Sequence, residues 1–394
     1  MKLPIYLDNH ATTPLDPEVF EVMKPYLLEK FGNASSKHSF GFEADAAVKY
    51  ARENIAKAIG AAAKEIYFTS GTTESINLVH FGIAQSYYKK GKRIITSAVE
   101  HSASLDSLKH LEQKGFDIVY LPVNKTGLID TEELKSSINN DTILVTIIAA
   151  NNEIGTIQDI KEIGNICREK NVFFHTDAAQ AIGKISFNLD ELNVDMISFS
   201  AHKIYGTKGI GALYVRSKNP AIKLEPQILG GGHENGLRSG TLNVPAIAGF
   251  GKAAELFYSS LKEESGRIEK LRDMLYNGII SELDGVHLNS SLHNGLPGNL
   301  NLSFEGVKAE TLLTSMREIA VSTGSACTSA SLKPSHVLKA IGLSDDLSRA
   351  SVRFGIGRFN TQEEIRYTID KVVKTVKELR QSSPLYKIKE ITTN

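Results

Sequence analysis

Apolar runs and amphipathic stretches alternate along the first part of the chain. Seven short runs rich in β-branched and aromatic residues predict strands, at residues 65–69, 93–98, 117–123, 142–150, 172–176, 195–200 and 212–216. The segments between them have the spacing of amphipathic helices, at residues 73–90, 104–114, 131–138 and 160–170. Strands that alternate with helices of this length favour a mostly parallel sheet with helices on both faces. The runs 142–150 and 172–176 are apolar on both sides, as buried parallel strands are.

The pattern changes near residue 258. Residues 243–283 have a long helical pattern, which we expect to divide into two or three helices. Two further strands and an amphipathic final helix are expected at 300–307, 351–357 and 362–381. This order is typical of a smaller α+β domain. We therefore predict a large α/β domain over residues 14–258 and a small domain formed by residues 1–13 and 259–394.

Composition narrows the class of protein. The 394 residues carry 45 Lys+Arg and 45 Asp+Glu, and this balance argues against a binder of nucleic acid or of anionic membranes. The two cysteines, Cys167 and Cys327, lie far apart without metal-ligand spacing, which argues against a disulfide scaffold or zinc ribbon and fits a reducing cytoplasm. The start has no signal-peptide pattern, and the longest apolar run, 142–150, is too short to span a membrane.

Chemistry is expected just after the predicted strands, because ligands of open α/β sheets bind beyond the carboxyl ends of the strands. The residues there that could bind a ligand or take part in catalysis are Thr72, Thr73, His101, Asn152, Asp177, Gln180 and Lys203. Each has an ordinary alternative: residues 70–75 could be a simple helix cap rather than a phosphate site, and Asp177 could cap a helix. Cys167 is interpreted as a buried apolar filler. The sequence GTKGIG (206–211) follows no strand and opens no helix, so we reject it as a dinucleotide motif.

Taken together, these residues match what pyridoxal phosphate requires. A helix start binds its phosphate, a carboxylate keeps its ring nitrogen protonated, a flat side chain stacks on the ring, and a lysine holds it as a Schiff base. Lys203 stands among small residues in SAHKIYG, which leaves room for a planar ring.

Nine motifs extend this reading to almost the whole chain. They are YLDNHATTP (6–14), FGNASSKHSFG (31–41), FTSGTTES (68–75), EHSA (100–103), NNEIGT (151–156), HTDAAQAIGK (175–184), SFSAHKIYGTKGIGALY (198–214), RSGT (238–241) and STGSACTSAS (322–331). With them the sequence closely resembles the cysteine desulfurases, in the class V branch of the fold-type I pyridoxal-phosphate enzymes. Departures from the family pattern occur at His10, Ala34, Ala201 and Thr207.

The resemblance implies a role for each matching residue. Lys203 would hold the cofactor, Asp177 would face its ring nitrogen, His101 would stack on the ring and move protons, and Gln180 would touch its phenolic oxygen near Asn152. Phosphate ligands would be Thr72, Thr73, Ser200 and His202, with Thr241 of the other subunit of a homodimer. Arg353, with Asn152, would bind the substrate carboxylate. Cys327 would be the nucleophile. No metal would be a permanent part of the protein, although Cys327 would transiently bind an iron–sulfur cluster.

The residues around Cys327 give an independent reason to expect a reactive thiol. Its neighbours are Ser and Thr in a stretch without periodicity, which indicates an exposed loop rather than a core. The expected reaction converts L-cysteine to L-alanine, leaves a persulfide on Cys327, and delivers the sulfur to an iron–sulfur scaffold or another acceptor protein.

Two other classes stay open at the sequence level. One is a different enzyme of this fold, an aminotransferase or a selenocysteine lyase, although an aminotransferase needs no thiol such as Cys327. The other is a scaffold or sulfur carrier without cofactor, against which the retained Lys203, Asp177 and His101 speak.

Overall fold

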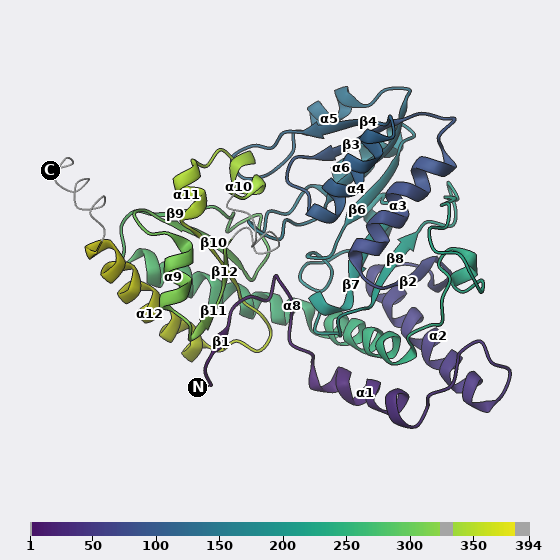
Figure 1. The fold of residues 1–394 in the computed structure, drawn as a ribbon, viewed down its shortest axis with the longest axis horizontal. Coiled ribbons are helices and arrows are strands. Elements are labelled where there is room, and N and C mark those ends of the chain that lie inside the picture. The colour runs from purple at the N-terminus through teal and green to yellow at the C-terminus, as the bar shows by residue number, and fades with distance from the viewer. Residues whose placement is uncertain (1, 324–333, 383–394) are drawn as a thin grey trace.

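A seven-stranded sheet forms the centre of the larger part of the molecule (Figure 1). The structure, a computed structural model, describes residues 2–323 and 334–382. The strand order is β2 (Ile66–Thr69), β8 (Gly211–Val215), β7 (Met196–Ser200), β6 (Phe173–Asp177), β5 (Thr142–Ile148), β3 (Arg93–Ser97) and β4 (Asp117–Leu121). Neighbouring strands from β7 to β4 are parallel, and β8 is antiparallel to both of its neighbours. The predicted mostly parallel sheet is confirmed.

Helices cover both faces of this sheet, as the alternating pattern predicts. One face packs against α3 (Thr72–Ser86) and α4 (Ser102–Gln113), in a cluster that includes Val79 and Leu108. The other face packs against α1 (Pro17–Leu28), α2 (Ser39–Ile59), α6 (Ile160–Glu169) and the first half of α8 (Val244–Ile280). Short helices α5 (Thr131–Ser137) and α7 (Leu189–Leu192) complete this part. Cys167 is buried in the second cluster, which confirms its role as a core residue.

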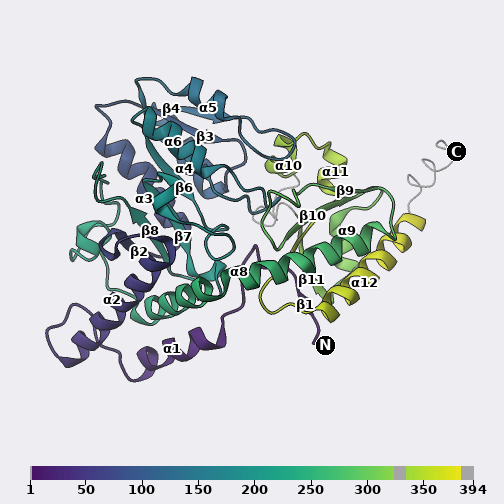
Figure 2. The ribbon, with the colours of Figure 1, turned by 180° about the vertical axis from the view of Figure 1, so that it is seen from behind.

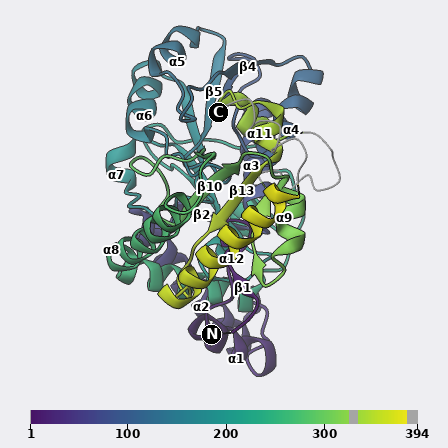
Figure 3. The same ribbon diagram turned by 90° about the vertical axis from the view of Figure 1, so that its left-hand side faces the viewer.

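A second, antiparallel sheet lies beside the first. Its order is β12 (Ser322–Thr323), β13 (Ser351–Gly355), β10 (Asn299–Phe304) and β9 (Val286–Leu288). Two more strands pair separately, β1 (Ile5–Tyr6) with β11 (Ile319–Ala320). The helices of this part are α9 (Ala309–Ser315), α10 (His336–Ala340), α11 (Asp345–Arg349) and α12 (Gln362–Gln381). Figure 3 looks onto α12, whose apolar face joins β10 and β13 in a separate core.

The expectation of two or three helices over 243–283 is wrong. One helix, α8, runs through 37 residues and contributes to both cores, with Phe257 in the first and Ile268 in the second. The polar stretch between these residues is a solvated part of a continuous helix rather than a loop. Figure 2 shows α8 passing from the larger sheet to a position beside α12. The predicted boundary at residue 258 falls inside α8, and the division into domains stays a prediction.

Within the described ranges, no helix combines the length and the apolarity needed to cross a membrane.

Candidate active site

A pocket of about 530 Å³ lies at the carboxyl ends of the parallel strands. Nine of the predicted site residues line it: Thr72, Thr73, His101, Asn152, Asp177, Gln180, His202, Lys203 and Arg353. Ser200 is buried at the end of β7, and Thr241 is exposed and does not line the pocket of its own chain. Cys327 lies outside the described residues.

Lys203 is positioned by the turn that follows β7. The chain passes from β7 into one 3₁₀ turn, η2 (Ala201–Lys203), and this turn directs the side chain toward the N-terminal segment. Nζ donates to the carbonyl oxygens of His10 (2.6 Å) and Ala11 (2.8 Å). The segment around His10 therefore forms one wall of the pocket, although His10 entered the sequence analysis only as a departure from the family pattern. Of the four departures, His10 is the one among the pocket-lining residues.

Asp177 is the last residue of β6, paired in register with Ile148 and Ser198 on the neighbouring strands. Its carboxylate is buried and accepts a hydrogen bond from the backbone N–H of Ala179 at 2.9 Å. Burial raises the pKa of this carboxyl, and the Ala179 N–H and the charges of His101 and Lys203 act in the opposite direction. A cation placed against Asp177 would therefore be stabilised.

His101 caps α4, and this contact fixes its tautomer. Nδ1 accepts a hydrogen bond from the backbone N–H of Ala103 at 3.1 Å. The neutral ring consequently carries its proton on Nε2. The flat imidazole lies in the pocket lining together with Asp177 and Lys203.

Glu100, directly before His101, is a buried carboxyl that sequence reasoning missed. Oε1 accepts hydrogen bonds from Ser97 Oγ (2.6 Å) and the backbone N–H of Ile148 (2.9 Å), whereas Oε2 has no partner among the described residues. Burial raises the pKa of Glu100 to about 8, so the carboxyl holds a proton at neutral pH. The only sequence signal was its place beside His101 after an apolar strand.

The opposite end of the pocket is suited to an anion. The backbone at Gly71 has φ +157°, and a Cβ at Gly211 would lie 2.6 Å from the Gly71 Cα, so both positions need glycine. The start of α3 lies here, since Gly71, Thr72 and Thr73 line the pocket, and N–H groups in the first turn of a helix attract anions. Thr72 Oγ1 and Ser200 Oγ are buried without a hydrogen-bond partner in the described part of the chain. These orphaned hydroxyls and the glycine turn fit a bound phosphate.

His202 stands at the same end of the pocket. Its Nδ1 lies 3.1 Å from Thr12 Oγ1. Burial, followed by the charges of Lys203, Lys208 and Lys184, lowers the pKa of His202 to about 4. The concentration of cations that depresses this pKa is also what would attract an anionic ligand.

Arg353 reaches the pocket from the middle of β13 in the antiparallel sheet. Its buried guanidinium donates to Asp8 Oδ1 (2.8 Å) and to the carbonyl oxygen of Asn152 (2.9 Å), and its Nε has no partner among the described residues. A planar guanidinium of this kind can bind a carboxylate with two parallel hydrogen bonds.

Glu153, the residue after Asn152, is a second buried carboxyl that the sequence analysis did not single out. It accepts a hydrogen bond from Ser335 Oγ at 2.5 Å. Burial raises its pKa to about 7, against the effect of that hydrogen bond and of the charges of Arg353 and His101.

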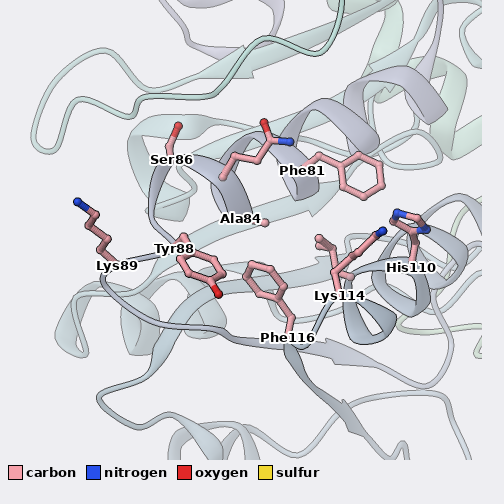
Figure 4. A pocket seen from close by; sticks show the side chains of 10 residues that line it. Phe81, Ala84, Ser86, Tyr88, Lys89, His110, Lys114 and Phe116 are labelled. Atoms are coloured by element: carbon pink, nitrogen blue, oxygen red, sulfur yellow. The ribbon is translucent and has the colours of Figure 1, made fainter.

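A second hollow, of about 680 Å³, lies at the far end of α3 and α4 (Figure 4). Aromatic and basic side chains surround it, among them Phe81, Tyr88, His110 and Lys114. No carboxylate is in this lining, so it offers no counterpart to Asp177. In addition, residues 2–323 and 334–382 contain no group of three or more His, Cys, Asp or Glu side chains that could hold a metal ion.

The sheet order and the pocket define an α/β enzyme of fold type I, the architecture predicted from the sequence. The chain belongs to the aminotransferase class-V family, whose model matches residues 5–367.

Among curated relatives, the chain is similar to "Cysteine desulfurase IscS" of Rickettsia prowazekii (strain Madrid E), with 52% identity over 98% of this chain and 95% of the relative. The protein of the same name from Anaeromyxobacter sp. (strain Fw109-5) is also 52% identical, over 98% and 96%. Among solved structures, a "NIFS-LIKE PROTEIN" has a TM-score of 0.89 at 40% identity, covering 95% of this chain and 100% of that one. "SspA in complex with cysteine" has a TM-score of 0.81 at 40% identity, covering 91% and 100%.

Proposed function

We propose that this protein is a cysteine desulfurase that uses pyridoxal 5′-phosphate to convert L-cysteine to L-alanine and passes the sulfur to Cys327. The observation that carries the proposal is the convergence of Lys203, Asp177 and Arg353 on one pocket. An amine, a carboxylate and a guanidinium in this arrangement serve a cofactor and an amino-acid substrate together. Near full-length similarity to the relatives described above supports the same activity.

The pocket residues fit this cofactor. Thr72, Thr73, Ser200 and His202 would hold its phosphate at the start of α3, where two of the hydroxyls are orphaned. Asp177 would face the ring nitrogen, Gln180 the phenolic oxygen, and His101 the ring face. Lys203 would hold the cofactor covalently. Pyridoxal phosphate, when bound, supplies an electron sink that stabilises negative charge at the substrate Cα.

The chain's own groups then act on L-cysteine. Arg353 and Asn152 bind and orient its carboxylate. Lys203 Nζ would accept the Cα proton of the bound substrate. His101 would act as a proton donor at Nε2, the ring nitrogen that carries its proton. The Cys327 thiolate would attack the substrate sulfur, so that a sulfur–sulfur bond forms and the carbon–sulfur bond breaks with its electron pair left on the β carbon. A proton added to the β carbon, and return of the proton held by Lys203 to Cα, complete alanine.

A homodimer, a cytoplasmic location and an acceptor protein belong to the same proposal. Several large side chains on the segment from α1 to α2 are exposed to solvent in the single chain: Phe20, Phe31, Phe40 and Phe42. Phe31 and Phe40 stack with ring centroids 5.5 Å apart. An exposed aromatic patch of this kind supports burial against a second copy, which would bring Thr241 of the partner subunit to the phosphate. The persulfide would pass to an iron–sulfur scaffold or another sulfur acceptor.

The test follows alanine and sulfur separately. The purified enzyme with L-cysteine and a thiol reductant should release alanine and sulfide in equal amounts. Lys203→Ala should lose the yellow, borohydride-sensitive chromophore and at least about 10³-fold in rate. Cys327→Ser should keep the chromophore and lose desulfuration.

Three results would contradict the proposal. One is release of pyruvate or of a transaminated product without sulfide. Another is full sulfide release by Cys327→Ser. The third is a wild-type protein that takes up no pyridoxal phosphate.

A further inference from the structure

The side-chain amide of Gln180 is held by an unusually complete set of contacts. Its Oε1 accepts a hydrogen bond from Lys184 Nζ at 2.5 Å and lies 3.1 Å from His10 Nδ1. Its Nε2 donates to the backbone carbonyl of His10 at 2.9 Å. Gln180 is buried and lines the pocket, whereas Lys184 lies behind it and does not line the pocket.

These partners determine which way the amide points. A backbone carbonyl can only accept, so the group facing the His10 carbonyl must be the NH₂ of Gln180. The amine of Lys184 donates to the group on the other side, which must be the oxygen. Reversing the amide would place the NH₂ against the lysine and the oxygen against the carbonyl, and both hydrogen bonds would be lost.

The same contacts determine the tautomer of His10. Gln180 Oε1 can only accept, so His10 Nδ1 must carry a proton to bond with it. His10 Nε2 is then a bare acceptor, and it is buried without a partner among the described residues. Burial and the charges of Lys184, Arg353 and Lys203 lower the pKa of His10, which keeps the ring neutral.

The backbone holds Lys184 in place. Gly183 has φ +77°, and a Cβ there would lie 2.5 Å from Ile204 Cγ2, so the chain can turn tightly at this point with glycine only. The carbonyl oxygen of Lys184 accepts a hydrogen bond from Ser265 Oγ of α8 at 2.9 Å. The amine is therefore directed back toward Gln180 by the fold.

We propose that Lys184 and His10 are positioning residues that hold Gln180 with its nitrogen toward the pocket, so that Gln180 can serve the bound cofactor only as a hydrogen-bond donor. The inference rests on the proposed function, because it needs a ligand with an electron-rich oxygen at this place. One N–H of Gln180 is used by His10, and the second remains for the phenolic oxygen of the cofactor. Donation to that oxygen withdraws electron density from it and weakens the hold of the adjacent Lys203 nitrogen on its proton.

The experiment measures the pH at which the visible absorption band of the bound cofactor changes. Burial and the charges of Lys203 and Arg353 lower the pKa of Lys184. Lys184→Met should move the midpoint upward by about half to one pH unit, the shift expected for losing one hydrogen bond. His10→Phe removes the Nδ1 proton while keeping an aromatic ring, somewhat larger than imidazole, at this position, and should move the midpoint upward by about half to one unit. Because His10 is neutral, its replacement changes no charge.

A double-mutant cycle separates positioning from a direct electrostatic effect of Lys184, which would shift the midpoint whether or not Gln180 is present. In a Gln180→Ala background, Lys184→Met and His10→Phe should cause no further shift. Lys252→Met, at a half-buried lysine that pairs with Glu18 and Glu255 on the outside of α8, should leave the midpoint at the wild-type value.

An unchanged midpoint in both single variants, or shifts of full size in the Gln180→Ala background, would overturn the inference. Far-UV circular dichroism identifies a variant that fails to fold. In that case the inference is tested with the other variant, alone and combined with Gln180→Ala. A wild-type protein without the visible band would instead refute the proposed function itself, so the two failures are distinguishable.

Discussion

The two sheets meet at the pocket and contribute to it in different ways. The parallel strands of the larger sheet all end at one edge, and the residues just beyond them bring His101, Asn152, Asp177 and Lys203 together from distant parts of the sequence. The antiparallel sheet has no such common edge, and it contributes a single lining residue, Arg353, from the middle of β13. Strand direction thus separates the groups with a proposed catalytic role, on one sheet, from Arg353, the proposed substrate-binding group, on the other.

The contacts between the two sides also differ from the contacts within each. Each sheet has its own apolar core. Near the pocket, polar links that cross between the two sides include Arg353 to the Asn152 carbonyl, Asn301 to the Glu153 carbonyl, and Ser335 to the Glu153 carboxyl. A small apolar cluster that includes Val99, Ile154 and Leu338 packs beside the Ser335–Glu153 contact. These links align one side with the other, so substitutions at them test that alignment.

Arg353→Lys tests the contribution of the antiparallel sheet and has the largest expected effect. Lysine keeps the charge but loses the planar fork and leaves Asp8 or the Asn152 carbonyl without a donor. Truncating one member of a buried charge pair costs about 2–5 kcal/mol. We therefore expect kcat/KM for L-cysteine to fall about 10²- to 10³-fold, mainly through KM, with the cofactor spectrum retained.

Arg380→Lys is the matched control for Arg353. Arg380 is also buried, on α12 behind the same sheet, and pairs with Asp284 and the Glu305 carbonyl outside the pocket. It should lower thermal stability without changing KM. Equal losses of kcat/KM in the two variants would mean that Arg353 acts through stability alone, and the division of roles between the sheets would be wrong.

The sequence predicted the architecture well because strand and helix signals were local. Each β-rich run became a strand and each amphipathic stretch a helix, and the predicted helix 362–381 has the bounds of α12. The failure at α8 has a physical reason: a helix that joins two cores is apolar at both ends and polar between them, and a local pattern interprets that polar part as a break.

The site was predictable as far as strand ends and motifs identify it, and no further. Nine predicted residues line the pocket. Glu100, Glu153 and Lys184 were missed, because their importance arises from burial and from partners distant in sequence, such as Ser335 for Glu153. Lys184 was part of a quoted motif, but its contact with Gln180 depends on the turn at Gly183, which no periodicity shows.

Glu100→Gln tests the parallel-sheet side of the pocket through the pH dependence of the free energy of unfolding. An unfolded Glu has a pKa of about 4.3, and burial raises the pKa of Glu100 in the folded protein to about 8. Between these values the folded state binds the extra proton, so this residue makes the free energy of unfolding fall as pH rises from about 5 to 8. The neutral amide should remove that slope and make the variant more stable than wild type at pH 8, by on the order of 3 kcal/mol.

Denaturant unfolding at pH 5, 6, 7 and 8 measures this slope. Glu21→Gln, at an exposed position on α1, should keep the wild-type pH dependence. A part of the slope should survive in Glu100→Gln below pH 7, because burial also raises the pKa of Glu153 to about 7. A Glu100→Gln variant that keeps the full wild-type fall in stability from pH 5 to 8 would show that the pKa of Glu100 is not raised in the folded protein.

Ser335→Ala tests the link between the two sides and has the smallest expected effect. Ser335 Oγ donates to Glu153 and accepts from the backbone N–H of Leu338 as the cap of α10. Ser344 Oγ caps α11 in the same way, through Leu347, without a carboxylate in its hydrogen bonds.

Ser335→Ala and Ser344→Ala should each cost about 1 kcal/mol for the loss of the cap. Ser335→Ala should cost about 1–2 kcal/mol more at pH 8, where Glu153 is ionised and loses a donor, and nearly nothing more at pH 6. Identical pH profiles for the two alanine variants would mean that the Ser335–Glu153 contact does not hold the two sides together.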